Sequence, residues 1–448
     1  MKAFKAYDIR GVYNRDFNAD DVYKIGFFLP RLLSTDKVLV GRDVRSSTEE
    51  VFEALSRGIN DAGADVYDMG LATTPMVYFG TAHFNFDASV QITASHNPKE
   101  YNGLKVSRSG ALPVGYESGL ADLEKLIASG IVEPVQKRGS IETIEVKKAY
   151  LEFMKKYVPD DLASLNMSVD CSNGMAALII KDLLGEEPHY LYDTLDGTFP
   201  NHAPNPLEEE NVRDLKEAVK KNKSDIGIIF DGDGDRVMFV DENGEFIQPD
   251  LIIAVLARYY LEREKGPVLQ DIRTSRSVSE YIRKLGGTPH TWKVGHAFAK
   301  LKLRELNAVF GGELAGHYYF RDFYNCDSGV LASLLVLQVV LEEKKAGVSI
   351  SQLIDEIKVY ANSGEINFHI EQKQAAMEAL KDHFSAQKAP SALLDFDGYR
   401  IEYPDWWFNV RPSNTEPYLR LVVEAPDQQQ LDQRLEEIRG VLKQFEDQ

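Results

Sequence analysis

A polar stretch between two apolar runs places one serine among groups that could assist a reaction. It reads QITASHNPKEYNGLKV and covers residues 91–106. The run ASVQI that leads into it is typical of a β-strand, so we expect Ser95 just past a strand end, where ligands bind in α/β sheets. A serine hydrolase would need a Gly-x-Ser-x-Gly turn, which is missing, and His96 is badly placed to be the base for its own neighbour. The stretch is either a plain polar hairpin or a loop that does other chemistry on Ser95.

Three aspartates alternate with glycines in the stretch IGIIFDGDGDRVMF. Asp231, Asp233 and Asp235 follow an apolar run, and Arg236 comes next. Alternation puts the carboxylates on one side of an extended segment, where they repel one another unless a cation lies among them. Oxygen ligands favour Mg²⁺ or Ca²⁺, and the spacing does not fit an EF-hand. We interpret the stretch as a metal site, in preference to a solvated acidic turn, and it needs another oxygen ligand such as a phosphate, which Arg236 could also hold.

A third stretch, AVFGGELAGHYYF, surrounds Glu313 and His317 with glycines that would let a ligand come close to the backbone. Glu313 could accept hydrogen bonds from sugar hydroxyls, and His317 could donate to a phosphate or move a proton. The alternative is a turn that serves packing alone.

The fourth stretch, FNVRPSNTEPYLRL, combines hydroxyls, an amide and guanidinium groups in a turn between two strands. These donors could cradle a phosphate, although an ordinary polar hairpin would use similar residues. The members of this predicted phosphate site are Arg411, Ser413, Asn414, Thr415 and Arg420.

Repeated strand–helix–strand units must position these loops. Residues 37–75, 166–197 and 267–298 each begin with a β-type run that ends at an aspartate, or is followed by one, and then enters a serine-containing turn. A helical pattern, a glycine-containing stop and a second β-type run follow, which implies parallel, buried strands. Three occurrences indicate three related α/β domains, unless they are chance likenesses between ordinary units of this kind.

The last eighty or so residues predict a smaller α+β domain, because a helical stretch is followed by strand, turn, strand and a closing helix. We predict domains at residues 1–145, 146–247, 248–365 and 366–448. Each contains one of the four loops. The expected fold is therefore three mixed-sheet α/β domains and a smaller C-terminal domain, arranged around a central cleft.

Composition limits the classes of function. The 448 residues carry a net charge of −19, which argues against a nucleic-acid partner. The longest apolar run is too short and too interrupted to span a membrane, and two cysteines cannot form a cysteine zinc site or a disulfide framework. The start of the chain lacks the apolar segment of a signal peptide. We expect a cytoplasmic enzyme that binds a small anion through a local cluster of Arg and Lys.

The four loops together resemble those of the α-D-phosphohexomutase family, which includes phosphomannomutases and phosphoglucomutases. The segments that carry the resemblance are YDIRG, TASHNP with NGLKV, DGDGDR, KVGHAF, GGELAGH and RPSNTEP. They run from Tyr7 to Pro417 in the family's order, so the resemblance covers almost the whole chain.

The resemblance implies a mechanism. Ser95 would carry a phosphoryl group, and its phosphate together with Asp231, Asp233 and Asp235 would hold Mg²⁺. The phosphoserine would donate to a hexose phosphate, giving a hexose 1,6-bisphosphate that turns around and returns its other phosphate to Ser95. Lys105 and His317 are the candidates for general base, and Lys105 would need a lowered pKa for that role. The remaining implied roles are phosphate handling for Arg236, orientation of the phosphoserine loop for Arg10, and substrate binding for Tyr7, Lys293, His296, Glu313, Arg411, Ser413, Asn414, Thr415 and Arg420.

The substrate is expected to be a hexose phosphate, first mannose and second glucose, with glucosamine phosphate as a third alternative. Many relatives have serine where this chain has Ala315, so one sugar contact is lost and the choice of hexose is blurred. A metal-dependent sugar phosphatase and a sugar-phosphate binding protein are the rival functions. The expected partners are phosphosugars, with no nucleic acid and no membrane, and the chain is expected to be a monomer or homodimer.

Overall fold

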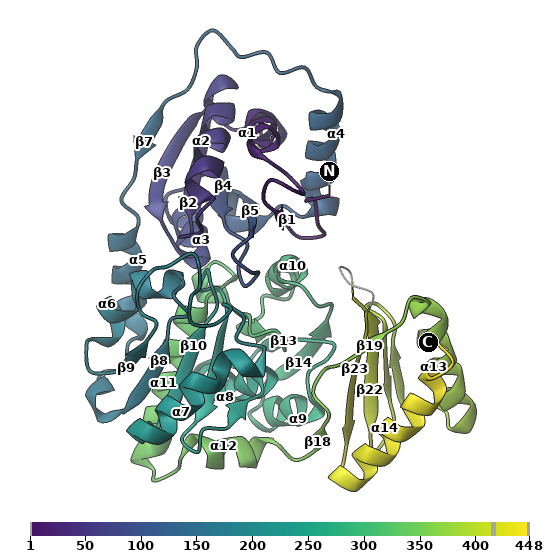
Figure 1. Cartoon of the computed structure of the whole chain (residues 1–448). Coiled ribbons are helices and arrows are strands. Elements are labelled where there is room, and N and C mark those ends of the chain that lie inside the picture. The colour runs from purple at the N-terminus through teal and green to yellow at the C-terminus, as the bar shows by residue number, and fades with distance from the viewer. Residues whose placement is uncertain (1, 414–417, 446–448) are drawn as a thin grey trace.

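The computed structural model describes residues 2–413 and 418–445. Figure 1 shows three α/β units packed against one another and a last unit beside them. Each α/β unit has a sheet of parallel central strands with antiparallel strands at one edge, and the last has an antiparallel sheet. The mixed-sheet prediction and the α+β prediction are both confirmed. No helix in these two ranges is long and apolar enough to cross a membrane.

The first sheet has the order β1-β5-β4-β2-β3-β7, with β6 beside β5. β4 runs parallel to β2 and antiparallel to β5. The loop that contains Ser95 therefore connects two strands, β4 and β5, that are hydrogen-bonded to each other. The strands are β1 (Ile9–Val12), β2 (Lys37–Arg42), β3 (Asp65–Leu71), β4 (Ala88–Ile92), β5 (Tyr101–Arg108), β6 (Leu112–Pro113) and β7 (Ile141–Thr143), and the helices are α1 (Ala19–Leu33), α2 (Thr48–Asp61), α3 (Thr74–His83) and α4 (Ala121–Ser129).

The second sheet has the order β12-β11-β10-β8-β9, and all five residues of β10 are buried. A fully apolar strand is stable here because sheet neighbours and helices cover both of its faces. The aspartates begin directly after β10. The elements are α5 (Lys147–Met154), β8 (Met167–Asp170), α6 (Ile180–Leu184), β9 (His189–Leu191), α7 (Glu209–Asn222), β10 (Ile226–Phe230), β11 (Val237–Asp241) and β12 (Phe246–Ile247).

The third sheet has the order β14-β13-β15-β16-β17. Its helix α11 is buried on nearly every side and packs in a core that the second and third units share. The elements are α8 (Pro249–Arg263), β13 (Pro267–Asp271), α9 (Arg276–Lys284), β14 (Thr288–Trp292), α10 (His296–Leu306), β15 (Phe310–Gly312), β16 (Tyr318–Phe320), β17 (Cys326–Asp327), α11 (Gly329–Lys345) and α12 (Ile350–Ile357).

The last unit has its own hydrophobic core, separate from that of the other three. Its sheet has the order β18-β23-β22-β21-β20, with β19 also paired to β23, and two helices cover one face. An independent core allows the unit to move as one body. The elements are β18 (Ala361–Asn362), β19 (Ile366–His369), α13 (Lys373–Gln387), β20 (Ala392–Leu394), β21 (Tyr399–Glu402), β22 (Trp407–Pro412), β23 (Tyr418–Ala425) and α14 (Gln428–Leu442).

Candidate active site

Ser95 lies three residues after the end of β4 and is buried, with its backbone in the left-handed region at φ 52°. A residue other than glycine adopts this conformation at a cost, so the surrounding contacts must hold it there. Its Oγ donates to Asp231 Oδ2 at 2.9 Å and lies 3.3 Å from Nδ1 of His96. Burial, followed by the charge of Arg236, lowers the pKa of His96 well below its usual value, so this ring is neutral.

A buried arginine holds the Ser95 loop in shape. Arg45 is fixed by Asp43, with Nε 3.1 Å from its carboxylate. Its terminal amino groups then donate to backbone carbonyls of the loop. The planar guanidinium is better suited to this than an ammonium, because it holds several donors in a fixed arrangement. The accepting carbonyls are those of Ser95, Asn97, Pro98 and Tyr101, at 2.7–3.1 Å.

Arg10 contacts the same loop from β1, because its Nη1 donates to Asn97 Oδ1 at 2.8 Å while Nη2 pairs with Asp8. This placement fits the orienting role predicted for Arg10.

A glycine lets the aspartate loop touch the serine loop. A Cβ added to Gly232 would lie 2.4 Å from the carbonyl oxygen of Ser95. That is closer than real Cβ atoms come to any neighbour, so only glycine permits this approach. The first aspartate of the loop therefore reaches the Ser95 hydroxyl.

Asp231, Asp233 and Asp235 are fully buried, and their carboxylate oxygens lie within 4.8 Å of one another. Lys105 supplies the opposite charge, with Nζ 2.7 Å from Asp233 and 2.5 Å from Asp235. The hydroxyl of Thr74 also donates to Asp233, at 2.5 Å. The aspartates converge on one point, as the alternation predicted.

The protonation of this cluster follows from burial and neighbouring charge. Burial, followed by the charges of the other two aspartates, raises the pKa of Asp231 well above its usual value. Burial acts on Asp233 in the same direction, but the Lys105 ammonium outweighs it and lowers its pKa. Burial would lower the pKa of Lys105, yet the two carboxylates hold it above its usual value. The two carboxylates thus favour the ammonium form of Lys105, and its role as general base stays a prediction.

The carboxylates fit a divalent cation. Within residues 2–413 and 418–445, Oδ1 of Asp233 and Oδ1 of Asp235 are buried and have no hydrogen-bond donor. Buried carboxylate oxygens without a donor are costly unless a cation or another proton donor meets them. These two oxygens, next to the carboxylate of Asp231, make an all-oxygen site that matches the preference of Mg²⁺.

His317 links the aspartate loop to the third domain. Nε of Arg236 donates to its Nε2 at 2.9 Å, which requires Nε2 to be unprotonated because arginine only donates. Its Nδ1 lies 2.7 Å from Asp327, which also pairs with the buried ammonium of Lys300 at 2.7 Å. His317 holds Arg236 in this arrangement, and its role as general base stays a prediction.

Glu313 faces the loop that follows β14. It accepts from the backbone N–H of Gly295 at 2.8 Å, and burial raises its pKa. His296 begins α10 next to it, and burial, followed by the charge of Lys300, lowers the pKa of this histidine well below its usual value. Lys293 lies over the ring of Phe298, and Ala315 is half-buried in the turn after Glu313. Lys293, His296, Glu313 and Ala315 thus belong to one side of the third domain.

The fourth loop is described only in part. Arg411 pairs with Asp397, with 3.3 Å between Nε and Oδ1, and Lys373 of α13 donates to the carbonyl of Ser413 at 3.0 Å. Arg420 lies opposite Arg411 across β22 and β23 and pairs with Glu365 at 3.3 Å. The predicted site residues Asn414 and Thr415 lie outside the described residues.

Contacts between side chains join the first three loops directly, through the Ser95–Asp231 and Arg236–His317 hydrogen bonds. The fourth loop reaches the others through Asp397, which accepts from the backbone N–H of Val294 at 2.8 Å.

Sequence reasoning missed the residues that hold the site together, namely Arg45, Thr74, Lys300, Asp327, Lys373 and Asp397. For Arg45 a signal was present, since Asp-x-Arg follows β2 as Asp43–Arg45 and follows β13 as Asp271–Arg273. In the second copy, Arg273 pairs with Asp271 at 2.8 Å and with Glu365 at 3.0 Å.

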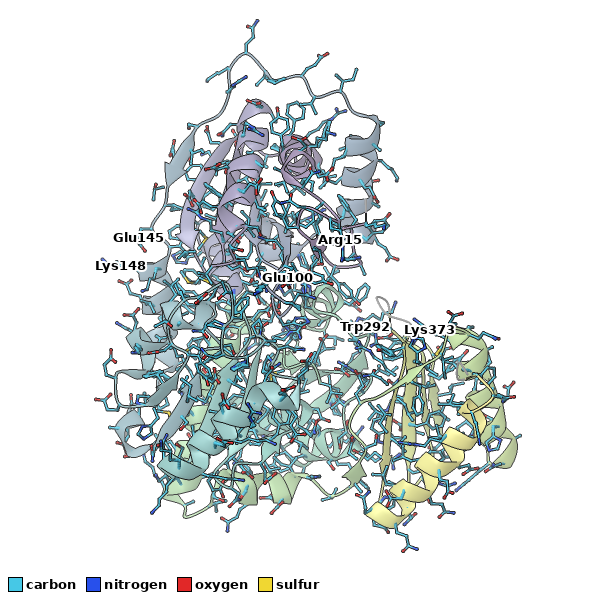
Figure 2. The ribbon with its side chains drawn as sticks, in the orientation of Figure 1. Arg15, Glu100, Glu145, Lys148, Trp292 and Lys373 are labelled. Carbon is cyan, nitrogen blue, oxygen red and sulfur yellow. The ribbon has the colours of Figure 1, made fainter. Side chains whose placement is uncertain are left out.

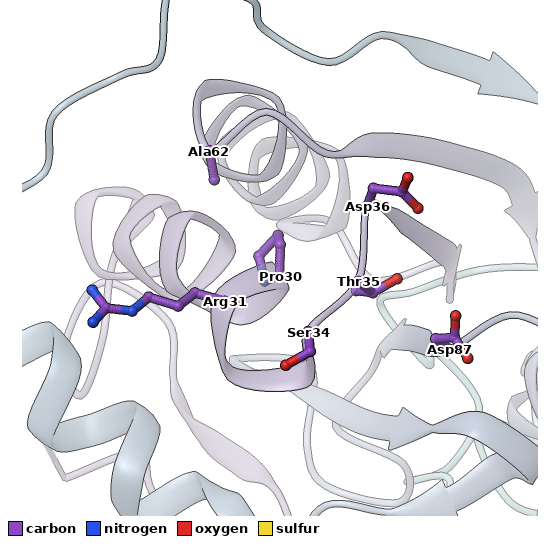
Figure 3. Close-up of a pocket in the computed structure, with 7 residues that line it drawn as sticks. All are labelled: Pro30, Arg31, Ser34, Thr35, Asp36, Ala62 and Asp87. Atoms are coloured by element: carbon purple, nitrogen blue, oxygen red, sulfur yellow. The ribbon is translucent and has the colours of Figure 1, made fainter.

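A surface hollow of about 560 Å³ lies elsewhere in the first domain. Its lining includes Asp36 and Asp87, which precede β2 and β4, so it is at the opposite edge of the sheet from Ser95 (Figure 3). It is therefore unrelated to the four loops, and the central cleft between the domains stays a prediction.

Comparisons with known proteins cover the whole chain. Family models named phosphoglucomutase/phosphomannomutase domains I, II and III match residues 1–130, 148–244 and 248–360, and the model of the C-terminal domain matches residues 365–441. Our four domain boundaries stay predictions.

Individual relatives agree with these models. A phosphomannomutase of Salmonella montevideo is 38% identical over 438 residues and 95% of each chain, and a protein named phosphohexose mutases from Xanthomonas campestris pv. campestris is 38% identical over 454 residues and 99% of each chain. A crystal structure of a phosphoglucomutase/phosphomannomutase family protein from Burkholderia thailandensis has a TM-score of 0.86 at 31% identity, covering 99% of this chain and 97% of that one. The chain therefore belongs to the phosphoglucomutase/phosphomannomutase family, the α-D-phosphohexomutases, as its motifs predicted.

Proposed function

We propose that this protein is a phosphohexomutase that interconverts hexose 1-phosphates and hexose 6-phosphates, with mannose phosphate as the first substrate and glucose phosphate as the second. The single observation that carries the proposal is the approach of two loops from different domains. It places the Ser95 hydroxyl 2.9 Å from Asp231 inside a cluster of buried carboxylates. A serine hydroxyl so placed suits phosphoryl transfer, which depends on positioning and on neutralising charge.

Ser95 is proposed to carry the phosphoryl group. The sugar hydroxyl attacks the phosphorus and gives its proton to a general base, for which Lys105 and His317 are the candidates. The bond from phosphorus to Oγ breaks, and the sugar then carries two phosphates. After the sugar has turned, Oγ attacks the other phosphate and Ser95 is phosphorylated again. The base returns the proton to the sugar oxygen that is freed in the second transfer. Arg45 and Arg10 keep the loop in place through both transfers, since they contact its backbone carbonyls and Asn97.

Asp231, Asp233 and Asp235 are proposed to hold Mg²⁺, together with an oxygen of the Ser95 phosphate. When bound there, the cation would neutralise charge on the transferring group and on the leaving Oγ. Arg236, held by His317 at 2.9 Å, is placed to pair with a phosphate next to Ser95. Lys105, with Nζ 2.7 Å from Asp233 and 2.5 Å from Asp235, is placed beside the transferring group.

Glu313 is proposed to bind sugar hydroxyls in both orientations of the intermediate, and Arg411 with its loop to bind the phosphate that is not being transferred. Lys293, His296 and Tyr7 are proposed to bind the substrate together with Glu313. Ala315 cannot contribute a hydroxyl, so the site relies on Glu313 and backbone groups to choose the hexose.

The test is a coupled assay with mannose, glucose and glucosamine 1-phosphates and a trace of glucose 1,6-bisphosphate. We expect hexose 6-phosphate to form with little free phosphate and the highest kcat/KM for mannose. The Ser95→Ala variant should be inactive. The intact mass of the wild type should exceed its calculated mass by one phosphoryl group, and the mass of Ser95→Ala should not. Stoichiometric release of phosphate would identify a phosphatase instead. Binding of the sugars without turnover, and without any phosphoryl mass, would identify a binding protein.

A further inference from the structure

Three domains meet at two adjacent residues, Val294 and Gly295, in the loop that joins β14 to α10. Tyr7 of the first domain donates its hydroxyl to the carbonyl of Val294 at 3.2 Å. The N–H of Gly295 donates to Glu313 at 2.8 Å. The N–H of Val294, one position earlier, donates to Asp397 of the last domain at 2.8 Å. The position of these two residues therefore depends on all three domains at once.

Gly295 has the backbone conformation that this arrangement requires. Its φ is 125°, and an added Cβ would lie 2.7 Å from the ring of Tyr7. Tyr7 can lie flat against the loop only because the position is glycine. The peptide between Val294 and Gly295 is thus pressed between the first domain and Glu313, and the N–H of Val294 is offered to the last domain.

Asp397 uses its two carboxylate oxygens for two different tasks. Oδ2 accepts from Val294 N–H, and Oδ1 lies 3.3 Å from Nε of Arg411. The contact with Arg411 is made through Nε. The ion pair therefore does not itself use the two terminal amino groups of Arg411, which are the groups that form paired hydrogen bonds with a phosphate.

A tight turn fixes Asp397 against the strand that carries Arg411. Gly398 follows at φ 68°, and a Cβ there would lie 2.2 Å from the carbonyl oxygen of Val410 and 2.7 Å from Cα of Arg411. Phe396, on the other side of Asp397, packs on Trp292 with 5.5 Å between ring centres. Figure 2 labels Trp292 where the third domain borders the last one. Backbone, ring and carboxylate contacts therefore place Asp397 at the seam between these domains.

We propose that Asp397 is a positioning residue, which orients the Arg411 guanidinium for the substrate phosphate and docks the last domain on the N–H of Val294, one residue before the N–H that holds Glu313. Binding of the phosphate that is not being transferred and docking of the last domain on the third domain are then coupled through Asp397. The first half of this inference rests on the proposed function, because it assigns Arg411 to a phosphate. The second half, the docking, stands on the contacts alone.

The test compares Asp397→Ala with Asp395→Ala, a matched control that removes an exposed carboxylate two residues earlier in the same turn. For mannose 1-phosphate we expect Asp397→Ala to raise KM at least tenfold, with a smaller change in kcat, and Asp395→Ala to change KM less than twofold. In an Arg411→Ala background, Asp397→Ala should add less than a further twofold, since its effect on the phosphate passes through Arg411. Equal behaviour of the two single variants, or effects that multiply fully in the double variant, would overturn the orienting role.

The docking role is tested by small-angle X-ray scattering of the ligand-free proteins. Asp397→Ala should have a larger radius of gyration than the wild type and Asp395→Ala, because the last domain has lost its contact with Val294. Asp397→Asn separates the two tasks, since its amide oxygen can still accept from Val294 while the charge facing Arg411 is gone. We expect wild-type scattering and a raised KM for this variant, and an unchanged radius in Asp397→Ala would refute docking. If the wild type turns over no hexose phosphate while Asp397→Ala still expands, the proposed function has failed and the docking has not.

Discussion

The close contact between Gly232 and Ser95 predicts that one added methyl group at position 232 lowers the catalytic rate. Gly232→Ala would place a Cβ 2.4 Å from the Ser95 carbonyl oxygen, and ordinary contacts begin at 3.4 Å. The obstacle is backbone on both sides, and the Ser95 loop is clamped by Arg45, so neither partner can rotate away. The two loops must separate by about 1 Å, the scale of misplacement that can cost roughly 100-fold in rate.

The expected result is a fall in kcat of about 10- to 100-fold, which corresponds to about 1.4–2.7 kcal/mol of activation free energy. Steady-state kinetics in the coupled assay measures it, and intact-mass analysis measures the fraction of Ser95 that carries phosphate, which should also fall.

Gly227→Ala is the control for simple overcrowding. Gly227 lies in β10, before the aspartate loop, and its added Cβ would meet Val219 Cγ2 at 2.6 Å, so the substitution crowds side chains of the core and leaves Ser95 untouched. Overpacking of this kind costs about 1–3 kcal/mol of stability. We expect Gly227→Ala to lower the melting temperature and keep kcat within a few-fold of the wild type. Wild-type kcat and phosphate content in Gly232→Ala would refute the argument that the loops need this approach.

Three other substitutions test separate parts of the structure. Arg45→Lys cannot span the carbonyls of the serine loop, so kcat should fall at least about tenfold; a wild-type kcat would mean that the loop holds its shape unaided. Ala315→Ser should change the ratio of kcat/KM for mannose and glucose 1-phosphates several-fold, up to about tenfold for one hydrogen bond, and an unchanged ratio would place residue 315 away from the sugar. Burial raises the pKa of Asp250 to about 6, although Ser275 N–H donates to it. The native state therefore binds this proton more tightly than the unfolded chain, and stability is lost as pH rises from about 4 through 6. Asp250→Asn removes that loss, so its advantage over the wild type in urea unfolding should grow toward pH 7, to on the order of 3 kcal/mol; an advantage that does not change with pH would contradict the assignment.

The strands and the loops that follow them could be predicted from the sequence because their signals are local. The apolar runs before Ser95 and Asp231 are strands β4 and β10, and each chemical group follows its strand within three residues. Alternation of aspartate and glycine was enough to place three carboxylates together.

The supporting residues could not be found in this way, because their roles depend on partners far along the chain. Lys105 could be named from a motif, but its protonation depends on Asp233, 128 residues away. Nothing in the sequence distinguishes Asp397 from the other aspartates, because its partners Val294 and Arg411 are brought to it only by the fold. His317 could be named as a candidate base, but its hydrogen bond from Arg236 joins residues 81 positions apart and could not be foreseen.

The Asp-x-Arg sequence that follows both β2 and β13 has a wider consequence. In both copies the aspartate fixes its arginine at the end of a parallel strand, but Arg45 then holds the loop that contains Ser95, while Arg273 reaches Glu365 at the entrance to the last domain. The same local pairing thus serves two ends, because the rest of the guanidinium contacts a loop of its own domain in one place and a neighbouring domain in the other.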